Sequence, residues 1–284
     1  MLSNPNLYVY HQGEIILLQD AFLHISDLAV QRGFGIFDFF KVQNNVPLFL
    51  DDYLQRFYES ARLMDLPVPF APDELKKVLY QLMEKNQIPE SGIKIVLTGG
   101  YSEDGYTPAA PNLIITQQPV SLPPTEVVQQ GIKIITYSFV RELAQAKTIN
   151  YTTGIRLMKQ VKARNATDVL YYHNGIITEF PRSNFFIVTQ DKQVRTPGQD
   201  VLKGITRKNV LELAAKKYPT EEGEVTLTDL AQAKEAFLTS TTKRIIPIVQ
   251  VNDQLVGNGK PGPVTLDLLQ DLTDLENQQA MVAI

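Results

Sequence analysis

Short apolar runs that come in pairs around polar turns are the feature that most restricts how this chain can fold. The runs on either side of His11-Gln12-Gly13, and those on either side of Asn44-Asn45, predict two β-hairpins near the start of the chain. A later pair, DVLYYHNGIITEF, turns at Asn174-Gly175, a dipeptide that favours a tight hairpin turn. Because most strands are joined in this way rather than through helices, the sequence predicts largely antiparallel sheets in an α+β fold.

Segments with helical spacing of apolar residues lie between these strands. One begins near Asp51-Asp52 and ends by Pro67, and a second begins at Pro72 and ends before Pro89. Further helices are predicted over about 151–164, over RKNVLELAAKKY and over VTLDLLQDLTDLE. These helices are expected to flank the sheets.

A polar, proline-rich stretch divides the chain. The segment QQPVSLPPTE, residues 117–126, contains three prolines and fits an extended connector. We therefore expect a small N-terminal α+β domain over 1–118, a linker over 119–127 and a larger α+β domain over 128–284.

Composition excludes several classes of chemistry. The 284 residues include no cysteine and three histidines without metal-ligand spacing, so we expect no disulfide, thiolate nucleophile or metal site. No G-x-S-x-G elbow is present for a serine hydrolase. The net charge of −4 argues against nucleic-acid binding, and no apolar run approaches the roughly 18 residues that a membrane helix needs. The first basic residue is Arg32, which does not fit a positively charged leader, so we expect a soluble, cytoplasmic protein.

Two segments are suited to binding an anion. Gly204-Ile205-Thr206 lies where a loop becomes a helix, so free backbone N–H groups and a hydroxyl converge there. Thr239-Ser240-Thr241-Thr242 follows an apolar strand and supplies four hydroxyls. Each segment alone is typical of a routine helix cap or turn.

Three charged residues stand out beside these turns. Lys147 lies between a strand and a helix among small and polar residues, and a lysine that attacks a carbonyl group must be partly desolvated. Glu179 lies in an apolar strand, where a carboxylate either faces solvent or pairs with a buried cation. Arg56 lies on a predicted helix, where most arginines are simply solvated. A lysine amine, a carboxylate and phosphate-binding turns are together the groups that pyridoxal 5′-phosphate requires.

The order of these motifs resembles the class IV (fold-type IV) pyridoxal-phosphate aminotransferases over nearly the whole chain. This family includes D-amino-acid transaminases, branched-chain aminotransferases and aminodeoxychorismate lyases. The resemblance implies the two-domain fold of D-amino-acid aminotransferases, a pyridoxal 5′-phosphate cofactor and a homodimer with a loop of the neighbouring subunit at the substrate. It is carried by eight segments in order: RGFGIFDFFKV, DDYLQRFYESA, LTGGYSEDGYTP, AKTINYTTG, ITEFPRSNFFIV, LKGITRKNV, EAFLTSTT and GNGKPGPVT.

The resemblance also implies roles for individual residues. Lys147 matches the catalytic lysine, which forms the Schiff base with the cofactor and shuttles the substrate α-proton. Glu179 matches the carboxylate that faces the pyridine nitrogen, and Tyr151 matches the tyrosine that branched-chain members direct at the cofactor's 3-hydroxyl group. The phosphate is expected to contact Arg56, Ile205, Thr206, Ser240 and Thr241.

Departures from the family pattern concern the substrate. Known D-amino-acid transaminases hold the substrate carboxylate with the arginine of a T-R-G motif, which here reads Thr98-Gly99-Gly100. Arg32 and Lys94 are the cations expected to compensate, although the subgroup that combines RGFG with LTGGY has an arginine where this chain has Lys94. Lys94 and Thr98 share one face of their strand because strand side chains alternate. Phe180 replaces a glycine of most members, and Tyr53 replaces a histidine of many.

We therefore expect a transaminase that works by a ping-pong cycle between an amino acid and a 2-oxo acid such as 2-oxoglutarate. The RGFG and TGGY pairing favours D-amino acids as donors, Tyr151 favours branched-chain L-amino acids as the alternative, and aminodeoxychorismate lyase activity comes third. A binding protein without turnover is the rival from another class, but it would need neither Lys147 nor Glu179. A metal-independent hydrolase is disfavoured by the scarcity of histidine.

Overall fold

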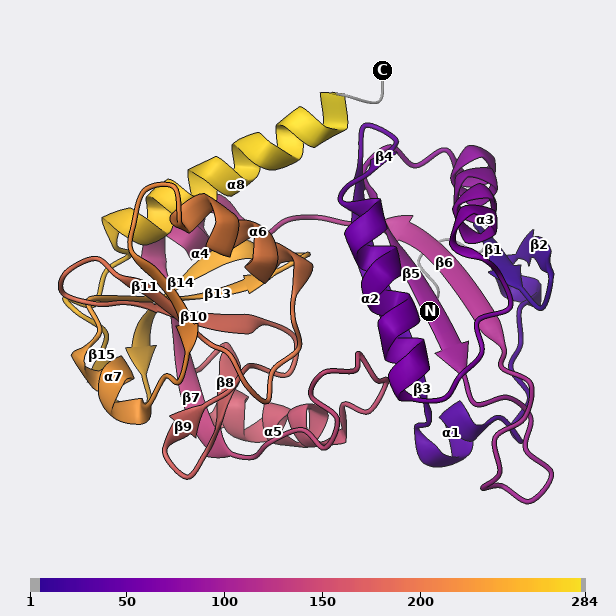
Figure 1. Cartoon of the computed structure of the whole chain (residues 1–284), viewed down its shortest axis with the longest axis horizontal. Coiled ribbons are helices and arrows are strands. Elements are labelled where there is room, and N and C mark those ends of the chain that lie inside the picture. The colour runs from indigo at the N-terminus through magenta and orange to yellow at the C-terminus, as the bar shows by residue number, and fades with distance from the viewer. Residues whose placement is uncertain (1–5, 282–284) are drawn as a thin grey trace. The chain divides into compact units, whose positions relative to one another are not determined.

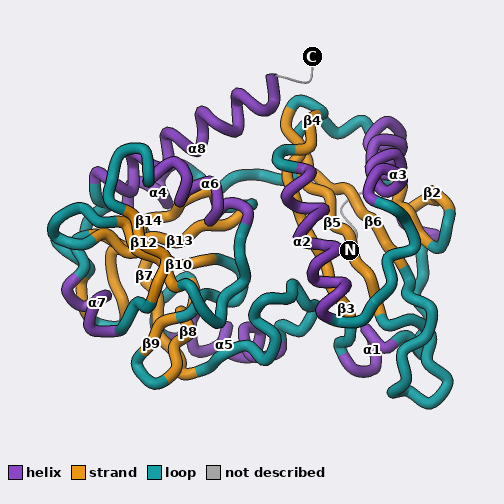
Figure 2. The backbone as a smooth tube through the Cα atoms, in the orientation of Figure 1, coloured by secondary structure: helices purple, strands orange, loops and turns teal. Residues whose placement is uncertain are grey.

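The computed structural model describes residues 6–281 of the chain, which group into two compact units. The first unit extends to Ser121 and also takes in Ala146–Asn150 and the end of the last helix from Gln279. The second unit consists of Leu122–Gln145 and Tyr151–Gln278. Each unit is built around its own β-sheet (Figures 1 and 2).

Within the described residues, the first unit has a six-stranded sheet in which every pair of neighbours is antiparallel and the order is β2-β1-β6-β5-β3-β4. Helix α2 packs on β3, and helix α3 packs on β1 and β6 (Figure 1). The elements are β1 (Tyr8–His11), β2 (Glu14–Leu17), the 3-10 helix η1 (Leu18–Asp20), α1 (Leu28–Arg32), β3 (Gly35–Gln43), β4 (Val46–Pro47), α2 (Leu50–Leu63), α3 (Pro72–Asn86), β5 (Ser91–Thr98) and β6 (Leu113–Pro119).

The two hairpins predicted near the start of the chain are confirmed as β1–β2 and β3–β4. Asn44 and Asn45 both adopt positive φ angles, of 52° and 62°, which is the conformation that a tight primed turn requires. Both helices predicted in this part of the chain are also confirmed. Pro72 occupies the first turn of α3, where its missing N–H costs nothing.

The second unit has a nine-stranded sheet within the described residues, in the order β12-β11-β10-β13-β14-β7-β8-β9, with β15 paired to β14. Most pairs are antiparallel, as predicted, but β7 is parallel to both β14 and β8, and β11 is parallel to β12. Helix α5 is the crossover that joins the parallel strands β7 and β8. The elements are α4 (Thr125–Gln130), β7 (Ile132–Ser138), α5 (Thr152–Ala163), β8 (Asp168–His173), β9 (Ile176–Ile177), β10 (Asn184–Val188), β11 (Val194–Pro197), α6 (Ile205–Ala214), β12 (Thr220–Gly223), α7 (Leu227–Gln232), β13 (Glu235–Ser240), β14 (Arg244–Val251), β15 (Gln254–Leu255) and α8 (Pro263–Met281).

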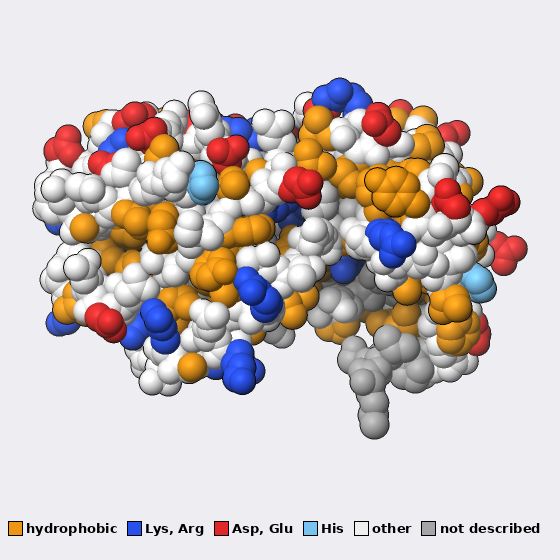
Figure 3. Space-filling model, turned by 90° about the horizontal axis from the view of Figure 1, so that it is seen from below, with side chains coloured by type: hydrophobic (Ala, Val, Ile, Leu, Met, Phe, Trp, Pro, Cys, Tyr) orange, Lys and Arg blue, Asp and Glu red, His pale blue; other side chains and the backbone are white. Residues whose placement is uncertain are grey.

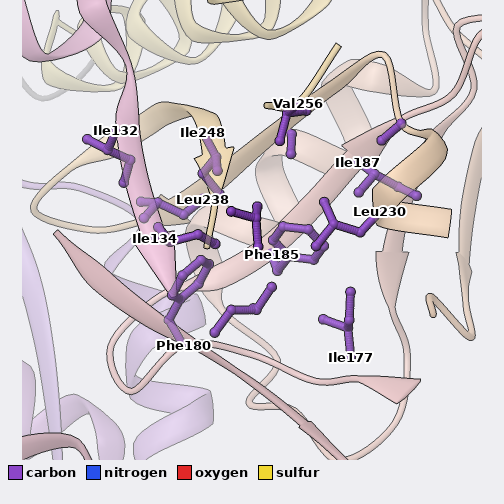
Figure 4. Close-up of a cluster of buried hydrophobic side chains, with 14 of the residues drawn as sticks. Ile132, Ile134, Ile177, Phe180, Phe185, Ile187, Leu230, Leu238, Ile248 and Val256 are labelled. Carbon is purple, nitrogen blue, oxygen red and sulfur yellow. The ribbon is translucent and has the colours of Figure 1, made fainter. Parts of the chain in front are cut away.

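The hydrophobic core of the second unit lies on both faces of this sheet. One cluster includes Phe185 of β10, Leu238 of β13 and Phe180, which lies in the loop between β9 and β10 (Figure 4). The other face packs Phe186 and Phe237 against α6 and α8, and their rings stack with centroids 4.9 Å apart. The hairpin predicted at Asn174-Gly175 is confirmed as β8–β9, and the helix predicted over about 151–164 is confirmed as α5.

The structure differs from the sequence-based division at two points. Strand β6 continues to Pro119 and α4 begins at Thr125, so the extended connector is shorter than the predicted 117–126. The prediction placed Lys147 in the C-terminal domain, whereas residues 146–150 group with the first unit. The reason is backbone pairing, because the N–H of Phe37 in β3 donates to the carbonyl of Lys147.

No helix within residues 6–281 is long and apolar enough to cross a membrane. On the face of the molecule in Figure 3, lysine and arginine side chains (blue) stand among acidic and apolar ones, in keeping with the net charge of −4. The cytoplasmic location stays a prediction.

Helix α8 begins on a buried carboxylate. Both oxygens of Glu235, at the start of β13, accept hydrogen bonds from the N-terminal turn of α8: from the Val264 N–H at 3.1 Å, the Thr265 N–H at 2.8 Å and the Thr265 hydroxyl at 2.7 Å. A carboxylate in this place satisfies N–H groups that the helix leaves without partners and complements the helix dipole.

We expect Glu235→Ala to lower the free energy of unfolding by about 2–3 kcal/mol, because it leaves the first N–H groups of α8 buried without acceptors. Chemical denaturation would measure the loss. Glu212→Ala, at an exposed position of α6, is the control and should change stability by no more than about 0.5 kcal/mol. Equal effects of the two substitutions would contradict this role of Glu235.

Candidate active site

Lys147 lies in an extended segment that adds to the edge of β3. Besides the bond from Phe37, the Ile149 N–H donates to the Gly35 carbonyl at 3.0 Å. The Lys147 N–H donates to the hydroxyl of Ser60 on α2 at 3.1 Å, and Ser60 is almost fully buried. The Lys147 backbone is therefore fixed by β3 and α2 together, and its side chain is half-buried, as a reactive lysine requires.

Two ammonium groups approach the ring of Phe37. The Lys147 Nζ lies 4.7 Å from the ring centroid and the Lys94 Nζ lies 5.0 Å from it. Lys94 retains exposed surface, but the protein around its ammonium group removes enough water to lower the pKa of Lys94 below the ordinary lysine value. The structure thus brings together two of the lysines that the sequence singled out.

Arg56 lies on α2 and pairs with a residue that the sequence analysis did not identify. Its Nε and Nη2 donate to the two oxygens of Asp38, at 2.9 and 2.6 Å. Asp38 lies on β3 and is fully buried, so this bidentate pair fixes the orientation of the guanidinium. Because successive strand residues face opposite sides, Asp38 and Phe37 project to opposite faces of the sheet.

Arg32 ends the short helix α1. Its Nη1 donates to the carbonyl of Gln31 at 3.1 Å, and the side chain is exposed. Among residues 6–281, neither Arg32 nor Lys94 forms an ion pair with a carboxylate. Both cations are therefore available to an anionic ligand.

In the second unit, Glu179 is a buried carboxylate surrounded by donors. Its Oε1 accepts from Nη1 of Arg141 at 3.0 Å, and its Oε2 accepts from the Leu202 N–H at 3.0 Å and from Nδ2 of Asn184 at 3.3 Å. Only 4% of Glu179 is exposed, so of the two alternatives that the sequence left open the carboxylate is the paired one, although its cation, Arg141, is only partly buried. The arginine and the amide donors stabilise the negative charge of the carboxylate.

Asn184 connects this carboxylate to the start of α6. Its Nδ2 also donates to the Leu202 carbonyl at 2.8 Å. Helix α6 begins after Gly204, and within the described part of the chain no side chain caps its first N–H groups. A Cβ atom at position 204 would lie 2.1 Å from Oδ1 of Asn184, so Gly204 is the residue that lets the turn lie against Asn184. Ile205 and Thr206 form the first residues of the helix.

The end of β13 lies on the same sheet, where Thr239 pairs in register with Asn184. The hydroxyl oxygens of Thr239 and Ser240 are buried, and neither has a hydrogen-bond partner among the described residues. Thr241 follows in the turn between β13 and β14. Two buried hydroxyls without partners and an uncapped helix N-terminus are the donors that a phosphate group uses.

Tyr151 occupies the N-cap position of α5, and its carbonyl accepts from the Ile155 N–H at 3.0 Å. Its side chain is half-buried. Tyr151 thus belongs to the second unit, whereas Lys147, four residues earlier in the chain, belongs to the first.

The first unit fixes Lys147 at the edge of its sheet. The second unit holds the Glu179 carboxylate close to an anion cradle, which consists of the start of α6 and the buried hydroxyls of Thr239 and Ser240. Both features agree with a comparison to protein families. The family model described as amino-transferase class IV matches residues 35–251. The chain belongs to this family. Class IV aminotransferases use pyridoxal 5′-phosphate, so this protein is a pyridoxal-phosphate aminotransferase, as the sequence predicted.

Relatives of two substrate classes resemble the chain over nearly its whole length. The D-alanine aminotransferase of Bacillus licheniformis is 28% identical over 263 residues, which cover 90% of this chain and 93% of the relative. The branched-chain-amino-acid aminotransferase of Pseudomonas aeruginosa is 26% identical over 285 residues, with 94% and 92% coverage. The comparisons therefore establish the family and include relatives of both substrate classes.

Solved structures confirm the fold-type IV fold. The crystal structure of the Escherichia coli branched-chain amino acid aminotransferase superposes with a TM-score of 0.88 at 25% identity and covers 95% of this chain and 94% of its own. The branched-chain aminotransferase of Thermoproteus uzoniensis with norvaline gives a TM-score of 0.86 at 22% identity, with 97% and 96% coverage.

The residues present fit this cofactor. The buried hydroxyl of Ser240 and the start of α6 would donate to its phosphate group, and the buried carboxylate of Glu179 would face its ring nitrogen. Arg141, Asn184 and Asp38 were not predicted from the sequence. Asp38 and Asn184 lie in two of the segments that carry the family resemblance, RGFGIFDFFKV and ITEFPRSNFFIV, and that position was their only signal.

We expect Gly204→Ala to weaken the binding of pyridoxal 5′-phosphate to the apoprotein by roughly 10- to 100-fold, because Asn184 must give up hydrogen bonds to a charged group and a carbonyl to make room. In an Asn184→Ala background the same substitution should weaken cofactor binding much less. Absorbance or fluorescence titration of each apoprotein with pyridoxal 5′-phosphate measures the dissociation constants.

Gly198→Ala is the matched control in the same loop, because a Cβ atom at this position meets nothing closer than 3.3 Å. It should leave the dissociation constant nearly unchanged. If Gly204→Ala and Asn184→Ala had additive effects on the free energy of cofactor binding, the two positions would be independent, which would contradict the proposed contact between them.

Proposed function

We propose that this protein transfers the amino group of a D-amino acid to a 2-oxo acid such as 2-oxoglutarate, in two half-reactions of a ping-pong cycle. The observation that carries the proposal is the buried Glu179 carboxylate, held by Arg141 and Asn184 next to an anion cradle. A protein that only binds a phosphate ligand has no use for a carboxylate maintained in this way. Glu179 would face the cofactor's ring nitrogen.

Several side chains would hold the cofactor. Ile205, Thr206 and Ser240 would donate to its phosphate group. The phosphate would also contact Arg56 and Thr241, and Tyr151 would face the 3-hydroxyl group. These assignments rest on the family resemblance and on the positions of the residues within each unit.

Lys147 would carry the reaction. Bound pyridoxal 5′-phosphate supplies an electron sink for the pair released when the substrate α-carbon loses its proton. The Nζ of Lys147 would hold the cofactor and take the α-proton from the substrate. It would return this proton to the cofactor carbon that is bonded to the transferred nitrogen. The backbone bonds to Phe37 and Ser60 keep the lysine stem in place during both transfers.

Arg32 and Lys94 would bind substrate carboxylates. Both are cations without a carboxylate partner among the described residues, and Lys94 approaches the same ring as Lys147. The RGFG and TGGY pairing and the similarity to D-alanine aminotransferases support D-amino acids. Tyr151 and the similarity to branched-chain enzymes support branched-chain L-amino acids as the second candidate. A homodimer with a loop of the neighbouring subunit at the substrate is part of the proposal.

Half-reactions of the holoenzyme with D- and L-alanine, glutamate and leucine test the proposal through the absorbance of the bound cofactor. We expect the D-enantiomers to react at least about tenfold faster, which corresponds to roughly 1.4 kcal/mol in the barrier. Faster reaction with L-leucine would favour the branched-chain alternative, and comparable rates with both leucine enantiomers would contradict both.

Lys147→Ala should abolish turnover and covalent labelling by borohydride, because no amine remains to hold the cofactor. Lys159→Ala, at an exposed position of α5, is the matched control and should behave as the wild type. Activity of Lys147→Ala comparable to that of the control would exclude the proposed mechanism.

The lowered pKa of Lys94 predicts a pH dependence of substrate binding. The ammonium binds a carboxylate only below its pKa, so the KM of the donor should rise as pH increases through a range below that of an ordinary lysine. Lys94→Arg keeps its charge at every accessible pH and should shift the rise to higher pH. Initial rates at several pH values measure both profiles, and identical profiles would contradict a role of Lys94 in binding.

A further inference from the structure

Asp27 is a fully buried carboxylate in the first unit that the mechanism above does not use. Its Oδ1 accepts from the Ala29 N–H at 2.7 Å. Its Oδ2 accepts from the hydroxyl of Thr98 at 2.7 Å and from Nδ2 of Asn112 at 2.8 Å. A buried carboxylate is costly unless donors surround it, and here the donors come from three separate segments.

These bonds join the RGFG segment, residues 32–35, to the TGGY turn, residues 98–101. Asp27 is the N-cap of α1, the helix that leads directly into the RGFG segment, and Thr98 ends β5. Backbone bonds continue the connection, because the Leu28 N–H donates to the Gly100 carbonyl at 3.0 Å and the Gly99 N–H donates to the Phe34 carbonyl at 3.1 Å. We call the two segments together the RGFG–TGGY platform.

The side chains of Phe34 and Leu28 pack closely over Gly99 within the platform. A Cβ atom at position 99 would lie 2.7 Å from the ring of Phe34 and 3.0 Å from the side chain of Leu28, which is itself buried. An arginine at this position, as in the T-R-G motif of known D-amino-acid transaminases, therefore has no space while Phe34 keeps its place. The RGFG segment itself excludes the T-R-G type of carboxylate receptor.

The substrate carboxylate must then be bound by a cation at another position, and the platform includes one, Arg32. Arg32 stands at the C-terminal end of α1, directly before Gly33, whose φ of 66° ends the helix in the left-handed conformation. The direction in which α1 presents Arg32 depends on its N-cap, which is Asp27.

We propose that Asp27 is a positioning residue for the substrate: it locks α1 and the RGFG segment onto the TGGY turn, so that Arg32 rather than position 99 provides the carboxylate receptor. The inference rests on the proposed transaminase function. Loss of the hydrogen bonds to Asp27 should weaken amino-acid binding and leave the anion cradle of the second unit intact.

Thr98→Val, Thr98→Ser and Asp27→Asn test this role in the holoenzyme. Valine removes the hydroxyl that donates to Asp27 and accepts from the Gly100 N–H, whereas serine keeps it. We expect Thr98→Val and Asp27→Asn to raise the KM of the amino donor about tenfold or more, with kcat changed less than about threefold, and Thr98→Ser to restore the wild-type KM. The affinity of each apoprotein for pyridoxal 5′-phosphate should stay within about twofold of wild type.

Limited trypsin digestion gives a readout that does not depend on turnover. Cleavage after Arg32, followed by mass spectrometry, should be faster in Asp27→Asn and Thr98→Val than in the wild type and Thr98→Ser, because the platform is no longer locked. Gly99→Arg should raise the KM of the donor, since it displaces Phe34.

Three results would overturn the inference: an unchanged KM in Thr98→Val, equal losses of donor and cofactor affinity, or a KM lowered by Gly99→Arg. Each of these requires a wild-type enzyme that transaminates amino acids. A wild-type holoenzyme that transaminates none of them overturns the proposed function instead, so the two failures are distinguishable. The rate of cleavage after Arg32 then still shows whether Asp27 locks the segment, and an unchanged rate in both variants counts against the inference.

Discussion

The residues of the second unit that are proposed to hold the cofactor depend on a single buried carboxylate, Glu179. Burying Glu179 would be prohibitively costly without donors, and Arg141, Asn184 and the Leu202 N–H supply them. The same Asn184 lies against Gly204, so the carboxylate and the start of α6 are held by one amide group. In the proposed function, the carboxylate that would face the ring nitrogen and the helix start that would bind the phosphate are therefore held by one shared side chain.

The first unit fixes Lys147, the proposed catalytic lysine, although this residue lies outside the helices and strands. A strand edge has unpaired N–H and C=O groups, and the segment around Lys147 uses those of β3. The backbone of Lys147 is then held as firmly as that of a strand residue. Lys94 on β5 and Arg32 on α1, the cations proposed to bind substrate carboxylates, belong to the same unit.

The hairpins and helices that depend on local residue patterns could be predicted from the sequence. Hairpins at Asn44-Asn45 and Asn174-Gly175 follow from turn chemistry, and α5 follows from its apolar spacing. Contacts between distant segments could not be predicted: Arg141 meets Glu179 across 38 positions, and nothing in the intervening residues marks the pair. The short helices α1, α4 and α7, of five or six residues each, were missed for a related reason, since their length leaves no periodicity to detect.

The grouping of residues 146–150 with the first unit has a consequence for the chain as a whole. The polypeptide passes from one unit to the other after Ser121, before Ala146, after Asn150 and before Gln279. A fragment that ends at the first crossing would leave the start of β3 without its outer neighbour. The two units are therefore not modules that could be exchanged between relatives by joining sequences at the proline-rich stretch, and recombination there would separate β3 from the strand segment that carries the lysine.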